Sequence, residues 1–130
     1  MTTSQAGGEP SAEFTLSWEG LFTFIGCIEA LDSEATRVEV MDALQVERDD
    51  LNAWSAQLLS VLDQPGDAYA VVLPPDYRDA IWLFYRACFD LLPESVVQTI
   101  SNRTRKEMES SEHELLAALE LAGLTPPPRG

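Results

Sequence analysis

Few residues in this 130-residue chain have a type and spacing that could do chemistry, and the most suggestive ones surround its one histidine. His113 stands between Glu112 and Glu114, and Glu109 comes four residues before it. On one continuous helix Glu109 and His113 would share a face, which is the minimum spacing for two metal ligands. A metal site needs at least a third protein ligand, and a helix start expected at Ser111 would separate the pair. We therefore expect a solvated helix start here and no metal site.

The two cysteines, Cys27 and Cys88, lie far apart in the sequence and in apolar surroundings. Neither has a second cysteine or a histidine near it at the spacing of metal ligands. Because an unpaired cysteine behaves as a small hydrophobic residue, we expect two buried free thiols. A disulfide that joins the two segments is the alternative.

The other patterns that usually accompany catalysis are not found in the sequence. Adjacent carboxylates such as Asp49 and Asp50 could do acid–base work, but in a chain this acidic such pairs arise by chance. There is no glycine-rich phosphate loop and no serine within a nucleophile elbow. We therefore predict that the protein is not an enzyme and has no catalytic residue and no cofactor.

Acidic residues outnumber basic ones by 22 to 8, which gives a formal net charge of −14. Most of this charge lies in residues 1–70, which hold 13 acidic and 2 basic residues. A field of this sign repels nucleic acid and anionic membranes. The charge therefore suits solubility or a basic protein partner, and we expect no direct binding to nucleic acid or to membranes.

Length and composition are those of one folded domain. A chain of 130 residues can bury one core, and 45 % of its residues are hydrophobic, which is ordinary for a globular protein. The longest apolar stretches, 21–28 and 80–92, are too short or too interrupted by charge to span a bilayer. The first residues lack the features of a signal peptide, so we expect a cytoplasmic protein. We predict a flexible arm over 1–12, one helical domain over 13–124 and a proline-rich tail over 125–130.

Hydrophobic periodicity predicts a mainly α fold, a compact bundle of about five helices. Residues 68–73 look like a strand and form either an extended connection or a lone strand. A lone strand has unpaired edges, so it would need a partner strand from elsewhere, for example from a second subunit. The predicted helices cover 17–31, 34–44, 49–63, 76–92, 94–109 and 112–122, with one bent helix over the second and third ranges as the alternative.

Local signals place several helix ends. Thr15 or Ser17 is the expected N-cap of the first helix, and Glu19 adds a favourable charge to its first turn. Ser111 and Glu114 have the spacing of a capping box, which would begin the last helix.

Further signals fall at the ends of the last two helices. Gly123 suits the left-handed residue that stops the last one. Pro93 fits the first turn of the helix over 94–109, where Arg103, Arg105 and Lys106 would complement the dipole at the C-terminal end.

The helices over 17–31 and 76–92 are apolar on more than one face, which a monomer of this size has difficulty burying. Association with a second copy, or insertion into the groove of a partner protein, would bury these faces. We therefore expect a homo-oligomer, with a dimer favoured. The candidate interface residues are Phe14, Trp18, Phe24, Trp82, Tyr85 and Phe89.

The segment from Thr36 to Trp54 resembles the apolar spacing of a helix-turn-helix motif. Met41 stands where that motif has a small residue, and Gln45 stands where it usually has glycine. The resemblance implies a recognition helix, yet Asp49 and Asp50 would oppose contact with phosphates. The residues that fall at packing positions of the motif are Val40, Ala43, Leu44, Val46, Leu51 and Trp54.

These observations favour a non-enzymatic protein-interaction module: an adaptor, a regulatory subunit, or an inhibitor of the immunity type. One alternative is an acidic mimic of nucleic acid that occupies the basic groove of a partner. Another is a degenerate helix-turn-helix that acts as a co-regulator. The candidate acidic surface consists of Glu39, Asp42, Glu47, Asp49 and Asp50.

Overall fold

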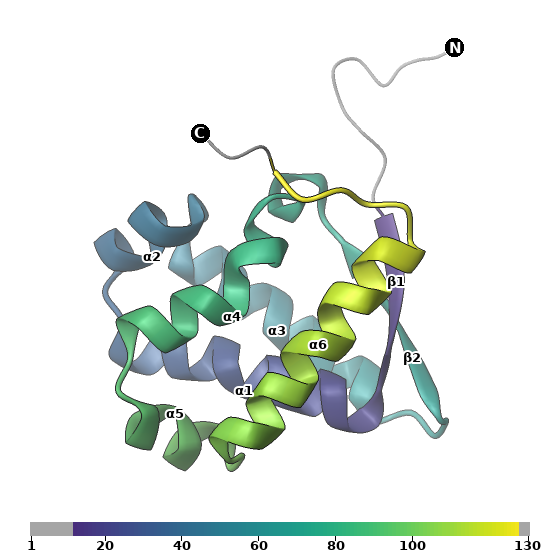
Figure 1. The fold of residues 1–130 in the computed structure, drawn as a ribbon, viewed down its shortest axis with the longest axis horizontal. Helices are drawn as coiled ribbons and strands as arrows, with labels where there is room; N and C mark the ends of the chain where they lie inside the picture. The colour runs from purple at the N-terminus through teal and green to yellow at the C-terminus, as the bar shows by residue number, and fades with distance from the viewer. Residues whose placement is uncertain (1–11, 128–130) are drawn as a thin grey trace.

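Two short strands far apart in the sequence pair at one end of the molecule (Figure 1). The computed structural model describes residues 12–127, which begin with strand β1 (Ala12–Ser17). β1 pairs antiparallel with β2 (Ala68–Leu73). Of the two alternatives for 68–73, the strand is therefore the one that forms, and its partner belongs to the same chain and not to a second subunit. Ala12 lies in this strand, and the other residues assigned to a flexible arm, 1–11, lie outside the described residues.

The alternation of side chains along β1 explains why this segment is extended. Phe14 and Leu16 are buried against the core, whereas Glu13 and Thr15 are exposed. This period of two is typical of a strand with one buried face. Ser17 then ends the strand and begins the first helix, because its hydroxyl accepts a hydrogen bond of 3.1 Å from the Gly20 N–H.

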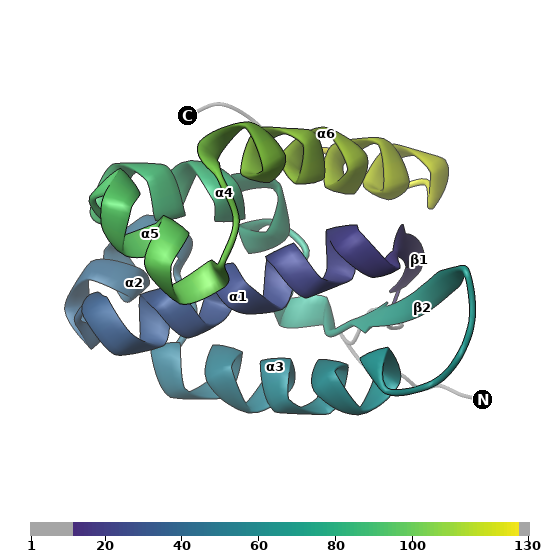
Figure 2. The same cartoon turned by 90° about the horizontal axis from the view of Figure 1, so that it is seen from below.

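Helix α1 (Trp18–Glu34) passes through the middle of the fold and is surrounded by other elements (Figure 2). α3 (Arg48–Leu62) lies along one side of it and α6 (Arg105–Leu121) along the other. Most of α1 is buried within the single chain, and exposed side chains such as Glu29 and Ser33 mark its solvent side. The segment is apolar on more than one face because several neighbouring elements cover it. The buried positions of α1 are Gly20, Leu21, Thr23, Phe24, Ile25, Gly26, Cys27, Ile28, Ala30 and Leu31.

The remaining helices close the end of the molecule opposite the sheet (Figures 1 and 2). They are α2 (Arg37–Leu44), α4 (Ala80–Leu91) and α5 (Glu94–Ser101), with a 3₁₀ turn over Pro75–Tyr77 before α4. α5 packs closely on α1, since a Cβ added at Gly26 would lie 2.9 Å from the Cα of Ser101. The mainly α fold is confirmed, with six helices and one two-stranded sheet in residues 12–127.

The boundary between α5 and α6 differs from the prediction. α5 ends at Ser101 and not at about residue 109, because Asn102 after it takes the left-handed conformation with φ 58°. α6 begins with a capping box between Thr104 and Glu107, so the predicted box at Ser111 is wrong. The basic residues Arg105 and Lys106 therefore lie in the first turn of α6 and not at the end of α5.

The end of α6 matches its prediction. Gly123 has φ 84°, and the Leu124 N–H donates to the Leu119 carbonyl at 3.1 Å. This is the hydrogen-bond pattern with which a single residue in the left-handed conformation ends an α-helix. Leu124 is buried, so it closes the helix with an apolar contact.

Candidate binding surfaces

Three of the six candidate interface residues belong to the core of the single chain. Phe14, Phe24 and Tyr85 are 3 %, 1 % and 2 % exposed. The Phe24 ring lies 4.7 Å from the Phe84 ring and 5.7 Å from the Trp54 ring, measured between centroids. The apolar faces of α1 and α4 are thus closed by one another and by α3. These three residues are not available to an interface, which corrects the prediction.

The other three candidates are only partly covered. Trp18 is 42 % exposed and stacks on Phe22 at 4.9 Å, near the sheet end of α1. Phe89, on α4, lies under the guanidinium of Arg105 at 4.0 Å, and Trp82 is half-buried on the same helix. A cation above an aromatic ring is itself stabilising, by roughly 0.5–1 kcal/mol at an exposed site. The partly exposed aromatic residues thus lie on two different helices.

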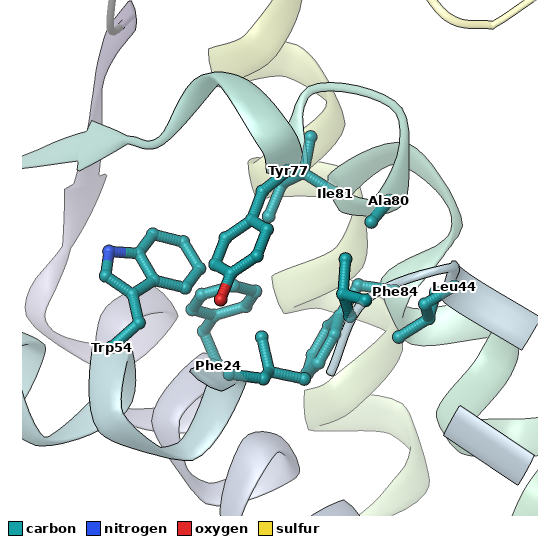
Figure 3. A pocket seen from close by; sticks show the side chains of 9 residues that line it. Phe24, Leu44, Trp54, Tyr77, Ala80, Ile81 and Phe84 are labelled. Carbon is teal, nitrogen blue, oxygen red and sulfur yellow. The ribbon is translucent and has the colours of Figure 1, made fainter. Parts of the chain in front are cut away.

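A cavity between α1, α2, α3 and α4 is too small to hold a ligand (Figure 3). Its volume is about 10 Å³, and apolar side chains such as Phe24, Trp54 and Ile81 line it. The Tyr77 ring closes one side, 5.2 Å from the Trp54 ring. Burial raises the pKa of Tyr77, and the charges of Asp50 and Asp76 raise it further. This cavity is a packing defect of the size of about one water molecule.

All five residues of the candidate acidic surface are exposed, and they lie on α2, on α3 and on the turn between them: Glu39, Asp42, Glu47, Asp49 and Asp50. Residues 29–50 carry eight acidic and two basic residues. Both of the basic ones form ion pairs with acidic residues of the same range. Arg37 pairs with Asp49 at 2.6 Å, and Arg48 reaches Asp32 at 3.7 Å.

Helix α2 exposes large apolar side chains among these carboxylates. Of its eight residues, only Val40 and Leu44 are buried. Val38 is 68 % exposed and Met41 is 40 % exposed. Residues three apart in a helix are neighbours on its surface, so Val38 and Met41 form one apolar spot with Asp42 beside it.

The turn between α2 and α3 has the backbone conformation that the resemblance to a helix-turn-helix requires. Gln45 follows α2 with φ 59° and ψ 36°, the left-handed region in which that motif usually places glycine. Only Val46 and Glu47 separate Gln45 from the first residue of α3. The exposed start of α3 nevertheless carries Asp49 and Asp50, as the sequence indicated.

Two grooves lie beside α6, one on each side of Glu114. The first has a volume of about 330 Å³, lies between α1 and the start of α6, and is polar. The second has a volume of about 350 Å³ and lies between β1 and the second half of α6. Glu114 separates them because its carboxylate accepts hydrogen bonds from the Ser17 N–H at 2.6 Å and the Ser17 hydroxyl at 2.9 Å. The sequence alone had placed Glu114 in a local capping box.

The residues that first suggested chemistry do not form a site within residues 12–127. Glu109 and His113 do share a face, since α6 is continuous, but no third ligand joins them in the described part of the chain. Cys27 and Cys88 are buried free thiols, as predicted, and the Cys88 thiol lies 3.8 Å from the Cys27 carbonyl oxygen. Burial raises the pKa of the Cys88 thiol well above its ordinary value, which keeps it protonated.

Tyr85 brings a further buried polar group close to these thiols. Burial raises its pKa well above the ordinary value, and its hydroxyl has no hydrogen-bond partner within residues 12–127. Glu112, on α6, is also buried, and it forms an ion pair with Arg86 of α4 at 3.1 Å. These groups are enclosed by the core, so they offer no access to a substrate.

Comparison of the chain with protein-family profiles, with curated proteins and with solved structures finds no match. None of the helices in the described range is long and apolar enough to cross a membrane.

Proposed function

We propose that the protein is a non-enzymatic interaction module that presents α2 and the start of α3 to a basic protein partner. The observation that carries this proposal is the exposed apolar spot of Val38 and Met41 within a surface of carboxylates. Protein interfaces commonly combine an apolar centre, often with methionine, and a polar rim. The acidic rim would speed association with a positively charged partner.

Burial of Phe14, Phe24 and Tyr85 argues against self-association through these residues, because they are already covered within one chain. The prediction of a dimer rested on the apolar faces of the helices over 17–31 and 76–92, which a single chain was not expected to bury. Half of the candidate interface residues pack within the chain, and the other three are partly covered and lie on two different helices, so the acidic surface is the better candidate for contact with another molecule. The chain's net charge of −14 also disfavours contact between two copies through this surface.

The test is capture of a partner from a native lysate by wild type and by two double variants. Asp42→Lys with Glu47→Lys reverses charge on the proposed surface without touching Glu39, whose side chain caps α2 at Thr36. Asp90→Lys with Glu120→Lys makes the same change in charge at exposed positions on α4 and α6. We expect the first variant to lose a basic partner that wild type and the second variant retain.

The salt dependence of capture distinguishes binding through the carboxylates from binding through the apolar spot of Val38 and Met41. Loss of the partner on raising salt from low to physiological concentration and above indicates binding through exposed charge, which salt screens. If the partner is also released by added DNA, the acidic surface acts as a mimic of nucleic acid. Equal capture by both double variants, or no capture by wild type, would contradict the proposal.

The second candidate is a co-regulator derived from a helix-turn-helix protein, and the left-handed Gln45 favours it. Such a protein would contact a DNA-bound partner and would not bind DNA itself, because Asp49 and Asp50 repel phosphates. Reversal of both aspartates to lysine should then create measurable affinity for duplex DNA at low salt. Lack of any affinity in that variant would count against this candidate.

A further inference from the structure

The groove between β1 and the second half of α6 borders a strand edge that has no partner strand within residues 12–127. β2 lies on one side of β1 and α6 on the other (Figures 1 and 2). The hydrogen bonds from Ser17 to Glu114 close one end of the groove. From there it extends along Glu13 to Thr15 on one wall and Ala117 to Ala122 on the other.

The hydrogen bond of the Ser17 N–H indicates which backbone groups of β1 face this groove. The Ser17 N–H donates to Glu114 on α6, so it points away from β2. Backbone direction alternates along a strand, and residues 13 and 15 therefore point their N–H and C=O groups the same way as Ser17. An edge of this kind is a template for an added strand.

The walls of the groove suit an extended chain of positive charge. Ala117 and Ala118 are small and leave room for a backbone to approach α6. Leu121 is 90 % exposed, so it offers an apolar contact that nothing in residues 12–127 covers. Glu13 is exposed at the mouth and would pair with a basic side chain.

We propose that this groove binds an extended, basic segment of a partner protein, which adds to β1 as a third strand. Main-chain hydrogen bonds to residues 13 and 15 would provide affinity, and the groove would select alternate side chains. A second copy of this chain is a poor occupant because it carries the same strong negative charge. The inference does not depend on the acidic surface of α2 and α3, so either proposal can fail without the other.

The probe is a panel of blocked hexapeptides in which arginine alternates with valine, leucine, tyrosine or threonine. Binding to the full chain is measured by fluorescence anisotropy at low salt. We expect at least one peptide to bind, and we expect Leu121→Glu and Glu13→Arg each to weaken it about tenfold or more. Leu83→Glu is the control, since Leu83 is also exposed but lies on α4; it should change affinity less than about twofold.

Two further changes test whether the peptide adds as a strand. Thr15→Pro removes the N–H that faces the groove, and Thr15→Val keeps it, so only the proline variant should lose binding. Two methylated peptides, one with methyl groups on the nitrogens of odd positions and one on those of even positions, provide a test that needs no change in the protein. Binding should be abolished by methylation of the set that faces β1 and retained after methylation of the other set.

The proposal is overturned if no peptide of the panel binds. It is also overturned if Leu121→Glu and Glu13→Arg bind as wild type does, or if both methylated registers bind equally. Formation of a dimer that Leu121→Glu dissolves would show that a second copy occupies the groove, which would overturn it as well.

Discussion

Glu114 joins three elements, so its removal should cost far more than the loss of an ordinary surface carboxylate. Its two oxygens accept the N–H and the hydroxyl of Ser17, and its charge lies at the N-terminus of α1. A hydrogen bond to a charged group contributes about 1.5–3 kcal/mol, and a favourable charge at a helix end about 0.3–1 kcal/mol. Allowing for water that would replace part of these contacts, we expect Glu114→Ala to lower the free energy of unfolding by about 2–4 kcal/mol.

A double-mutant cycle identifies the partner of Glu114. Ser17→Ala keeps the backbone N–H and removes only the hydroxyl, so the coupling between Ser17→Ala and Glu114→Ala reports one charge-assisted hydrogen bond, about 1–2 kcal/mol. The measurement is urea unfolding at neutral pH, followed by circular dichroism. Glu120→Ala, an exposed change on the same helix, is the control and should lie within about 0.5 kcal/mol of wild type.

Two results would refute this reasoning. Additive effects of Ser17→Ala and Glu114→Ala, within about 0.5 kcal/mol, would mean that the Ser17 hydroxyl does not bond to the Glu114 carboxylate. Strong coupling between Ser111→Ala and Glu114→Ala, with none to Ser17, would mean that α6 begins at the box suggested by the sequence and not at Thr104.

Three more experiments test the contact between α1 and α5, the cap of α6 and the buried thiol of Cys88. Gly26→Ala should lower the free energy of unfolding by about 1–3 kcal/mol in urea melts, because the new methyl would overlap Ser101, although alanine usually stabilises a helix. Hydrogen bonds from Thr104 hold the pKa of Glu107 below its ordinary value, so the ionised carboxylate stabilises the folded state. This stabilisation is fully present above the pKa of Glu107 in the unfolded chain and is lost as pH falls through its pKa in the folded chain. Urea melts should therefore show a deficit for Glu107→Gln at pH 7 that shrinks below about pH 4. The thiol of Cys88 should resist thiol reagents in the native state at neutral pH and react once urea unfolds the chain.

Helix ends were predictable where the signal is local and has no competitor. Ser17 caps α1, and Gly123 stops α6, because each conformation is set by one residue and its immediate neighbours. The break between α2 and α3 was also visible, as polar residues interrupt the apolar pattern there. The strand β1 was missed although Phe14 and Leu16 alternate with polar residues, a signal of period two that was present in the sequence.

The start of α6 could not be chosen from local pattern alone. Thr104 with Glu107 and Ser111 with Glu114 have the same spacing, and either could begin a helix. Tertiary packing decides between them: Ser111 is buried within the helix, and Glu114 is drawn away to Ser17. Interface residues were misjudged for a related reason, since periodicity shows that a face is apolar but not which element covers it.

The pairing of β1 with β2 also orders events during folding. Ala12 and Leu73 meet at one end of the sheet, and the whole of α1, α2 and α3 lies in the loop that they close. Closing a long loop costs entropy that only formed contacts can offset, and helices form faster than such distant pairs. The sheet should therefore assemble after the three helices have packed, so amide protons of β1 would gain protection later in refolding than those of α1. A chain that emerges N-terminus first would hold β1 without its partner until β2 has been made.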